Sequence, residues 1–79
     1  MGACMTWNYR IVRYRDGSGF GLHRVHYDAN NFPWMMTESP AVFVGDSVDE
    51  LQKSLLLAYN DANARPVFDE PEVWLGKGP

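Results

Sequence analysis

The sequence has few of the residues from which catalytic and metal sites are usually built. It contains one cysteine, Cys4, and two histidines, His23 and His26, in 79 residues. A single cysteine excludes an internal disulfide and so removes the main sign of an oxidising compartment. No apolar run approaches the roughly 18 residues that a membrane span needs, and the first residues lack the pattern of a signal peptide. A cytoplasmic protein is therefore expected.

The scarcity of these residues also argues against an enzyme. Two histidines three positions apart on an extended strand point to opposite faces, so His23 and His26 cannot share a metal ion. The run Gly17-Ser-Gly-Phe-Gly21 has closely spaced glycines, but a phosphate-binding loop needs a helix after its glycines and here a strand is predicted. We therefore predict no catalytic residue, no cofactor and no metal.

The sequence does contain enough apolar and aromatic side chains for a folded domain. Apolar residues make up 46% and aromatic residues 14% of the chain, which is typical of globular proteins. A chain of this length has room for one hydrophobic core. We predict a single domain over residues 1–79, with residues 1–5 as a flexible leader and residues 76–79 as a flexible tail.

The strongest helix signal begins at Ser47. Glu50 follows three residues later and completes a capping box, in which the Ser47 hydroxyl accepts a hydrogen bond from the Glu50 amide. Pro66 forces the preceding residue out of helical geometry, so the helix should end by about Asn63. Apolar residues recur at three- and four-residue spacing and predict one buried face. These residues are Val48, Leu51, Leu55, Ala58, Tyr59 and Ala62.

Three stretches before this helix have the composition of β-strands. Residues 6–15 are followed by the turn signal Asp16-Gly-Ser-Gly19 and by a second extended run, residues 20–27. Residues 34–38 can supply a third antiparallel strand, and residues 41–44 a short extended bridge to the helix. After the helix, Val67 and Phe68 are expected to dock at the sheet edge.

The predicted fold class is α+β, because neither a small sheet nor a single helix is stable alone. We expect a three-stranded antiparallel meander followed by one amphipathic helix packed on one of its faces, in the order β-β-β-α.

The net charge of −3 is divided unevenly along the chain. Residues 1–27 contain four arginines and one aspartate, a balance of +3, whereas residues 28–79 contain nine acidic and three basic residues, a balance of −6. We therefore expect a domain with one basic and one acidic side.

Four segments resemble a group of small uncharacterised proteins from bacterial genomes and prophages. They are Trp7-Asn-Tyr-Arg-Ile-Val12, His23-Arg-Val-His-Tyr-Asp28, Ser47-Val-Asp-Glu-Leu51 and Arg65-Pro-Val-Phe-Asp69, in this order over about residues 6–70. The resemblance implies three strands followed by a helix and carries no activity. By its size, acidity and lack of a catalytic motif, the chain also looks like a phage anti-CRISPR inhibitor, which would act in the cytoplasm of the host bacterium. That second resemblance is one of type and assigns no role to any residue.

The leading functional hypothesis is a non-catalytic, anti-CRISPR-like inhibitor. Carboxylates on a rigid scaffold can act as a DNA mimic and cover the basic surface where a CRISPR effector holds DNA. The residues expected to do so are Glu38, Asp46, Asp49, Glu50, Asp69, Glu70 and Glu72. Solvation and helix capping explain part of this set equally well. The expected partner is a protein such as a CRISPR effector subunit, without direct nucleic-acid or membrane binding.

Two alternatives remain open. The first is a nucleic-acid-binding hairpin, because interleaved arginine and aromatic residues suit phosphate contact and base stacking. Its residues would be Arg10, Arg13, Arg15, Arg24 and Tyr14, although arginines on a strand also simply keep a sheet soluble. The second is a bacterial accessory protein, a monomer or weak homodimer, that makes protein contacts through a strand edge or through Trp34, Met35 and Met36.

Overall fold

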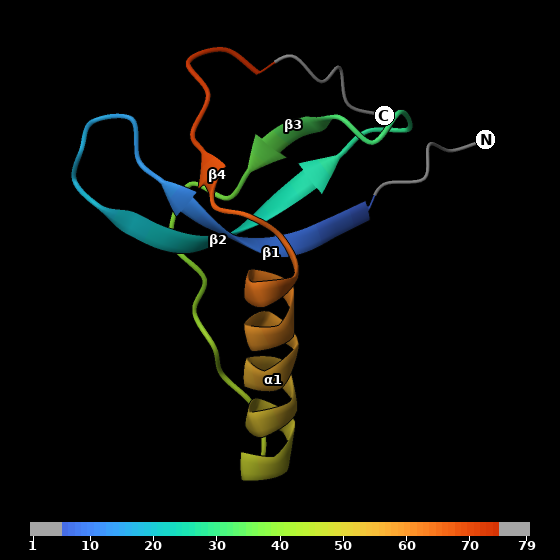
Figure 1. Ribbon diagram of the computed structural model, residues 1–79. Helices are drawn as coiled ribbons and strands as arrows, with labels where there is room; N and C mark the ends of the chain where they lie inside the picture. Colours follow the sequence, from blue (N-terminus) through green and yellow to red (C-terminus); the bar gives the residue numbers. More distant parts are fainter. Residues whose placement is uncertain (1–5, 75–79) are drawn as a thin grey trace.

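A computed structural model describes residues 6–74 of the 79-residue chain. In this part of the chain one helix and four strands are formed (Figure 1). They are β1 (Thr6–Arg13), β2 (Phe20–Tyr27), β3 (Pro33–Met36), α1 (Val48–Ala64) and β4 (Phe68–Asp69). The strands form one sheet in the order β3-β2-β1-β4. The α+β class is confirmed, whereas the predicted leader and tail, with Cys4, lie outside the described residues.

The β1–β2 hairpin agrees closely with the sequence prediction. The two strands pair antiparallel from Thr6↔Tyr27 to Arg13↔Phe20. The connecting turn places Gly17 at φ 79° and Gly19 at φ 128°, conformations that glycine adopts without a steric penalty. The Asp16 carboxylate accepts a hydrogen bond from the Ser18 backbone N–H at 2.8 Å and so closes the turn.

The third strand is antiparallel, as predicted, but shorter than residues 34–38. β3 pairs with β2 through Val25↔Met36, His26↔Met35 and Tyr27↔Pro33, with a register shift between His26 and Tyr27. In the preceding loop the buried Asp28 accepts hydrogen bonds from the backbone of Asn30 at 2.9 Å and of Phe32 at 3.0 Å. Residues 41–44, predicted to be extended, form no strand.

A fourth strand makes the sheet mixed, so the prediction of a purely antiparallel meander is wrong in part. β4 pairs in parallel with β1 through Val12↔Phe68 and Arg13↔Asp69. The connection through α1 carries the chain from the β3 edge of the sheet back to the β1 edge, and a crossover of this length permits parallel pairing. The expected docking of Phe68 at a sheet edge is thus confirmed.

α1 begins at the predicted cap, and its final residue, Ala64, lies one position after the predicted end. The Ser47 hydroxyl accepts a hydrogen bond from Glu50 N at 3.1 Å. Arg65, which precedes Pro66, is extended with φ −136° and ends the helix.

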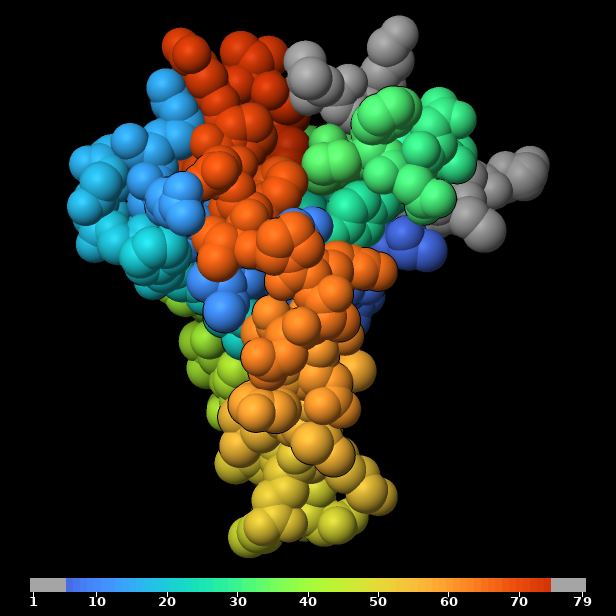
Figure 2. All heavy atoms as spheres, in the orientation of Figure 1, coloured from blue at the N-terminus to red at the C-terminus, as the bar shows by residue number. Residues whose placement is uncertain are grey.

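The helix does not lie across a sheet face. Figure 1 shows α1 standing away from the sheet, with its C-terminal end near β1 and its N-terminal turns projecting beyond the strands. The preceding loop descends beside it, and a Cβ added at Gly45 would lie 3.0 Å from Leu51 N. We call α1 together with residues 40–46 the stalk; it forms the narrow lower part of the molecule in Figure 2.

This orientation divides the core and leaves most of the predicted helix face uncovered. Val12, Val25 and His23 are buried on one sheet face, while on the other Tyr9 packs against Phe43 with ring centroids 5.6 Å apart. Ala58 is the buried residue of α1. The prediction of a buried apolar stripe is wrong for Val48, Leu55 and Tyr59, which are 73%, 46% and 67% exposed. Because α1 meets the sheet only near its C-terminal end, the sheet cannot cover the rest of the helix.

Candidate functional site

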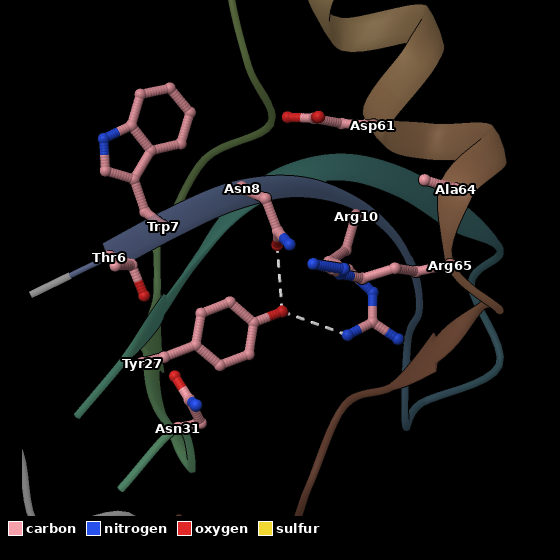
Figure 3. Close-up of a pocket in the computed structure, with 9 residues that line it drawn as sticks. All are labelled: Thr6, Trp7, Asn8, Arg10, Tyr27, Asn31, Asp61, Ala64 and Arg65. Carbon is pink, nitrogen blue, oxygen red and sulfur yellow. Dashed lines mark hydrogen bonds between the residues drawn. The ribbon is translucent and has the colours of Figure 1, made fainter. Parts of the chain in front are cut away.

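A hollow of about 550 Å³ lies beside the N-terminal half of β1 and the C-terminal end of α1 (Figure 3). Its volume is within the usual range of small-molecule sites. It is lined by Thr6, Trp7, Asn8, Arg10, Tyr27, Asn31, Asp61, Ala64 and Arg65. We call it the arginine pocket, because two of its side chains carry guanidinium groups.

Strand alternation and sheet register assemble most of this pocket. Thr6, Asn8 and Arg10 are alternate residues of β1 and share one sheet face, and Tyr27 on β2 pairs with Thr6 and joins them there. The end of α1 adds Asp61, Ala64 and, just past it, Arg65. Residues far apart in sequence thus meet at one hollow.

The Arg10 guanidinium is held in place by its contacts. Its Nη1 donates to the Tyr27 hydroxyl at 3.0 Å, and that hydroxyl donates to Asn8 Oδ1 at 2.9 Å (Figure 3). Its Nη2 donates to the Pro66 carbonyl at 2.9 Å, and the group lies 5.2 Å from the centre of the Phe68 ring. Its Nε is buried and has no hydrogen-bond partner among the described residues. The charge is therefore fixed at the pocket.

Neither arginine of the pocket is neutralised by an ion pair with a described residue. Salt bridges within residues 6–74 join Arg13 to Asp69 at 3.0 Å, Arg15 to Glu72 at 3.8 Å and Lys53 to Asp49 at 3.2 Å. The one carboxylate of the pocket, Asp61, accepts a hydrogen bond from the Tyr9 backbone N–H at 3.2 Å. In Figure 3 the Arg65 side chain extends toward Arg10. Two guanidinium groups facing one hollow suit an oxyanion such as a phosphate or carboxylate.

The predicted acidic residues do not gather on one face. Asp46, Asp49 and Glu50 lie at the free end of the stalk, at the start of a 17-residue helix that is about 25 Å long. Asp69, Glu70 and Glu72 lie at the other end, at and after β4, and Glu38 follows β3. Asp69 and Glu72 face Arg13 and Arg15, and Glu70 accepts from the Arg15 backbone N–H at 3.1 Å.

The predicted basic residues are separated in the same way. Arg13 pairs with Asp69 of β4, Arg15 pairs with Glu72 after β4, and Arg24 lies 4.7 Å from the centre of the Trp7 ring. Of the five residues predicted for a nucleic-acid face, Arg10 alone lines the arginine pocket. Arg65 was not among the predicted site residues. Its place directly after a helix and before Pro66 was visible in the sequence, but nothing there linked it to β1.

The other predicted nucleic-acid residue, Tyr14, belongs to a half-buried hydrogen-bonded group around the buried His23. Its hydroxyl lies 2.6 Å from Nε2 of His23, and His23 Nδ1 lies 2.9 Å from the Thr37 carbonyl. Since a carbonyl only accepts, Nδ1 carries the proton and the Tyr14 hydroxyl donates to Nε2. His26 instead lies near Trp7, with ring centroids 6.5 Å apart. These contacts anchor the hairpin to the segment after β3.

Within residues 6–74, no set of three or more histidine, cysteine, aspartate or glutamate side chains is placed to hold a metal ion. In the same part of the chain no helix has both the length and the apolarity required to cross a bilayer.

Comparison of the chain with protein-family models, with curated proteins and with solved structures gave no match.

Proposed function

We propose that this chain is a non-catalytic binding protein that holds an anionic group of its ligand between Arg10 and Arg65. The observation that carries the proposal is the arginine pocket, where two guanidinium groups line one hollow of about 550 Å³ without an ion-pairing carboxylate among the described residues. An isolated cation at a pocket wall gains most from a ligand that supplies the missing negative charge.

The pocket suits an oxyanion for a second reason. The contacts of Arg10 with Tyr27 and Pro66 fix its guanidinium before a ligand arrives, so little side-chain entropy is lost on binding. Thr6 and Asn31 add uncharged hydrogen-bonding groups to the lining. Phosphate and carboxylate share the chemistry that such a site recognises, and the test therefore includes both.

The test is a titration of the full chain with inorganic phosphate, adenosine monophosphate or succinate, each in a separate experiment. Binding is monitored by the NMR signals of the arginine Nε–H groups. The expected result is a saturable shift at Arg10 and Arg65 with at least one oxyanion. Arg65→Gln should weaken that binding about tenfold or more, since a charge-assisted hydrogen bond contributes about 1.5–3 kcal/mol.

Lys53→Gln is the matched control, because it removes the same charge from an exposed site on α1, where Lys53 pairs only with Asp49 among the described residues. It should leave the affinity within about twofold, the effect expected of a distant exposed charge. An equal loss in both variants, or no saturable shift in any titration, would overturn the proposal.

A second candidate function is the anti-CRISPR-like inhibitor, and one observation favours it. Asp46, Asp49 and Glu50 are exposed together at the free end of the stalk, where Lys53 is the one basic side chain that pairs with them in the described part. A projecting acidic tip can enter a basic groove of a partner without interference from the sheet.

Pull-down of purified CRISPR effector subunits tests this second candidate. Asp46→Lys with Asp49→Lys should abolish capture, whereas Asp69→Lys with Glu70→Lys, at the other end of the molecule, should have a smaller effect. Unchanged capture after the charges of Asp46 and Asp49 are reversed would exclude the DNA-mimic mechanism. Loss of oxyanion binding in Arg65→Gln with capture intact would separate the two candidates.

A further inference from the structure

The stalk presents an apolar face that no described part of the chain covers. Val48, Leu55 and Tyr59 lie within about 40° of one another around the helix axis, and Leu56 lies beside them. Val48, Leu56 and Tyr59 are all more than half exposed. We call these four residues the stalk face.

The centre of the stalk face, around Val48, Leu55 and Tyr59, contains no charged residue. Gln52 and Asn63 are the polar residues between Tyr59 and Leu56, Asp49 borders the face about 20° from Leu56, and Lys53 and Glu50 lie farther round the helix. An exposed helix normally carries charges on its solvent side. Here one exposed side of the helix is apolar along Val48, Leu55 and Tyr59, which is the pattern of a helix with a protein neighbour.

The segment that precedes the helix is also apolar and exposed. Val42 and Val44 are each 81% exposed, the highest values among the large apolar residues described. The backbone of residues 42–45 forms no hydrogen bond with another residue of the described part. An extended apolar segment with free N–H and C=O groups can pair with a partner's backbone.

The exposed apolar area of the stalk is of the order that a dimer needs. Side chains of this size, exposed to this extent, offer on the order of 500 Å² of apolar surface for the six residues together. An interface of standard size buries about 800 Å² from each partner, a little over half of it apolar. A monomer, in contrast, fully buries just four apolar residues in its described part, namely Tyr9, Val12, Val25 and Ala58.

We propose that the stalk face is the interface of a homodimer, in which the α1 helices of two copies pack antiparallel about a two-fold axis near Gln52 and Leu55. The antiparallel arrangement separates the acidic helix starts, which would repel each other side by side. It also places the two sheets at opposite ends of the helix pair, because the sheet lies at one end of the stalk (Figure 2). Asp61 and Ala64 of the arginine pocket lie on the other side of α1, so pairing leaves that pocket open.

Light scattering on the full chain at about 10 and 100 µM tests the proposal. The expected mass at the higher concentration is twice the 9.0 kDa of a single chain. Leu56→Glu and Tyr59→Glu should each raise the dissociation constant at least tenfold. Leu57→Glu is the matched control, because Leu57 is 50% exposed and lies opposite Val48 on the helix; it should keep the dimer.

A monomer mass at both concentrations would overturn the proposal. A Tyr59→Glu variant with the same dimer mass as the unchanged chain would overturn it as well. Circular dichroism of each variant identifies any loss of mass that comes from unfolding. Spin labels test the orientation in a Cys4→Ser background: the distance between the two copies should be shorter for Gln52→Cys than for Asn63→Cys. The reverse order would contradict antiparallel packing.

Discussion

The hydroxyl of Tyr14 lies 2.6 Å from Nε2 of His23, and His23 is only 1% exposed. Because His23 Nδ1 is within 2.9 Å of the Thr37 carbonyl, one buried ring joins the hairpin tip to the chain that leaves β3. Both ring nitrogens of a buried histidine need partners, so this pair is a sensitive point of the fold.

Tyr14→Phe should destabilise the protein by about 1–3 kcal/mol, since it leaves a buried nitrogen without a donor. The free energy of unfolding is measured by urea denaturation, with tryptophan fluorescence as the signal. Ser39→Ala, which removes a hydroxyl from an exposed position, is the control and should change the free energy of unfolding by less than about 0.5 kcal/mol. Similar effects for the two variants would show that the Tyr14–His23 contact contributes nothing.

Gly21→Ala should be destabilising because a Cβ at this position would meet the Tyr14 hydroxyl, with the ring carbon Cζ at 2.9 Å. Tyr14 would have to move off His23, and overpacking of this kind costs about 1–3 kcal/mol. In a Tyr14→Phe background the same change should cost less, since the hydroxyl and its hydrogen bond are already gone. Fully additive effects in this double-mutant cycle would contradict the assigned contact.

Ser47→Ala should lower the free energy of unfolding by about 1 kcal/mol through loss of the helix cap. Ser39→Ala, in an exposed loop, is the control. Thermal unfolding by circular dichroism at 222 nm compares the two. Because the cap lies at the free end of the stalk, hydrogen exchange should rise mainly in the first turns of α1, and a uniform rise along α1 would be unexpected.

Asp16 should make the stability of the fold depend on pH in the acid range. Hydrogen bonds from the Ser18 side chain and backbone lower the pKa of this carboxyl from 3.8 in the folded state. The stabilisation is present above pH 3.8 and is lost as the pH falls through the lower, folded-state pKa. As the pH falls below 3.8, the unchanged chain should therefore lose more stability than Asp16→Asn, as denaturant midpoints would show. Parallel curves would exclude a contribution from Asp16.

Local signals in the sequence predicted local structure well. The capping box at Ser47 and Glu50, the glycine turn and the two long strands are each decided by residues within a few positions of one another. Phe68 was expected at a sheet edge, but its parallel pairing with Val12 depends on where the crossover returns the chain. Local composition does not determine that position.

The parts that the sequence could not predict depend on tertiary placement. The spacing of Val48, Leu55 and Tyr59 predicted a buried face of α1, which is wrong for these residues, because spacing does not say what covers a face. The charge imbalance between the two parts of the chain suggested two faces, whereas β4 places Asp69 beside Arg13 and mixes them. Arg65 joined the arginine pocket only because α1 ends near β1.

The pairing of β4 with β1 also bears on the order in which the chain can fold. Phe68 contacts Val12 across a stretch that includes the helix, so this edge closes a large loop, whereas the β1–β2 hairpin needs only its short turn. During synthesis, β1 and β2 can pair early, but the outer edge of β1 stays open until Phe68 and Asp69 have left the ribosome. Until then the nascent sheet exposes the edge that a neighbouring nascent chain could occupy.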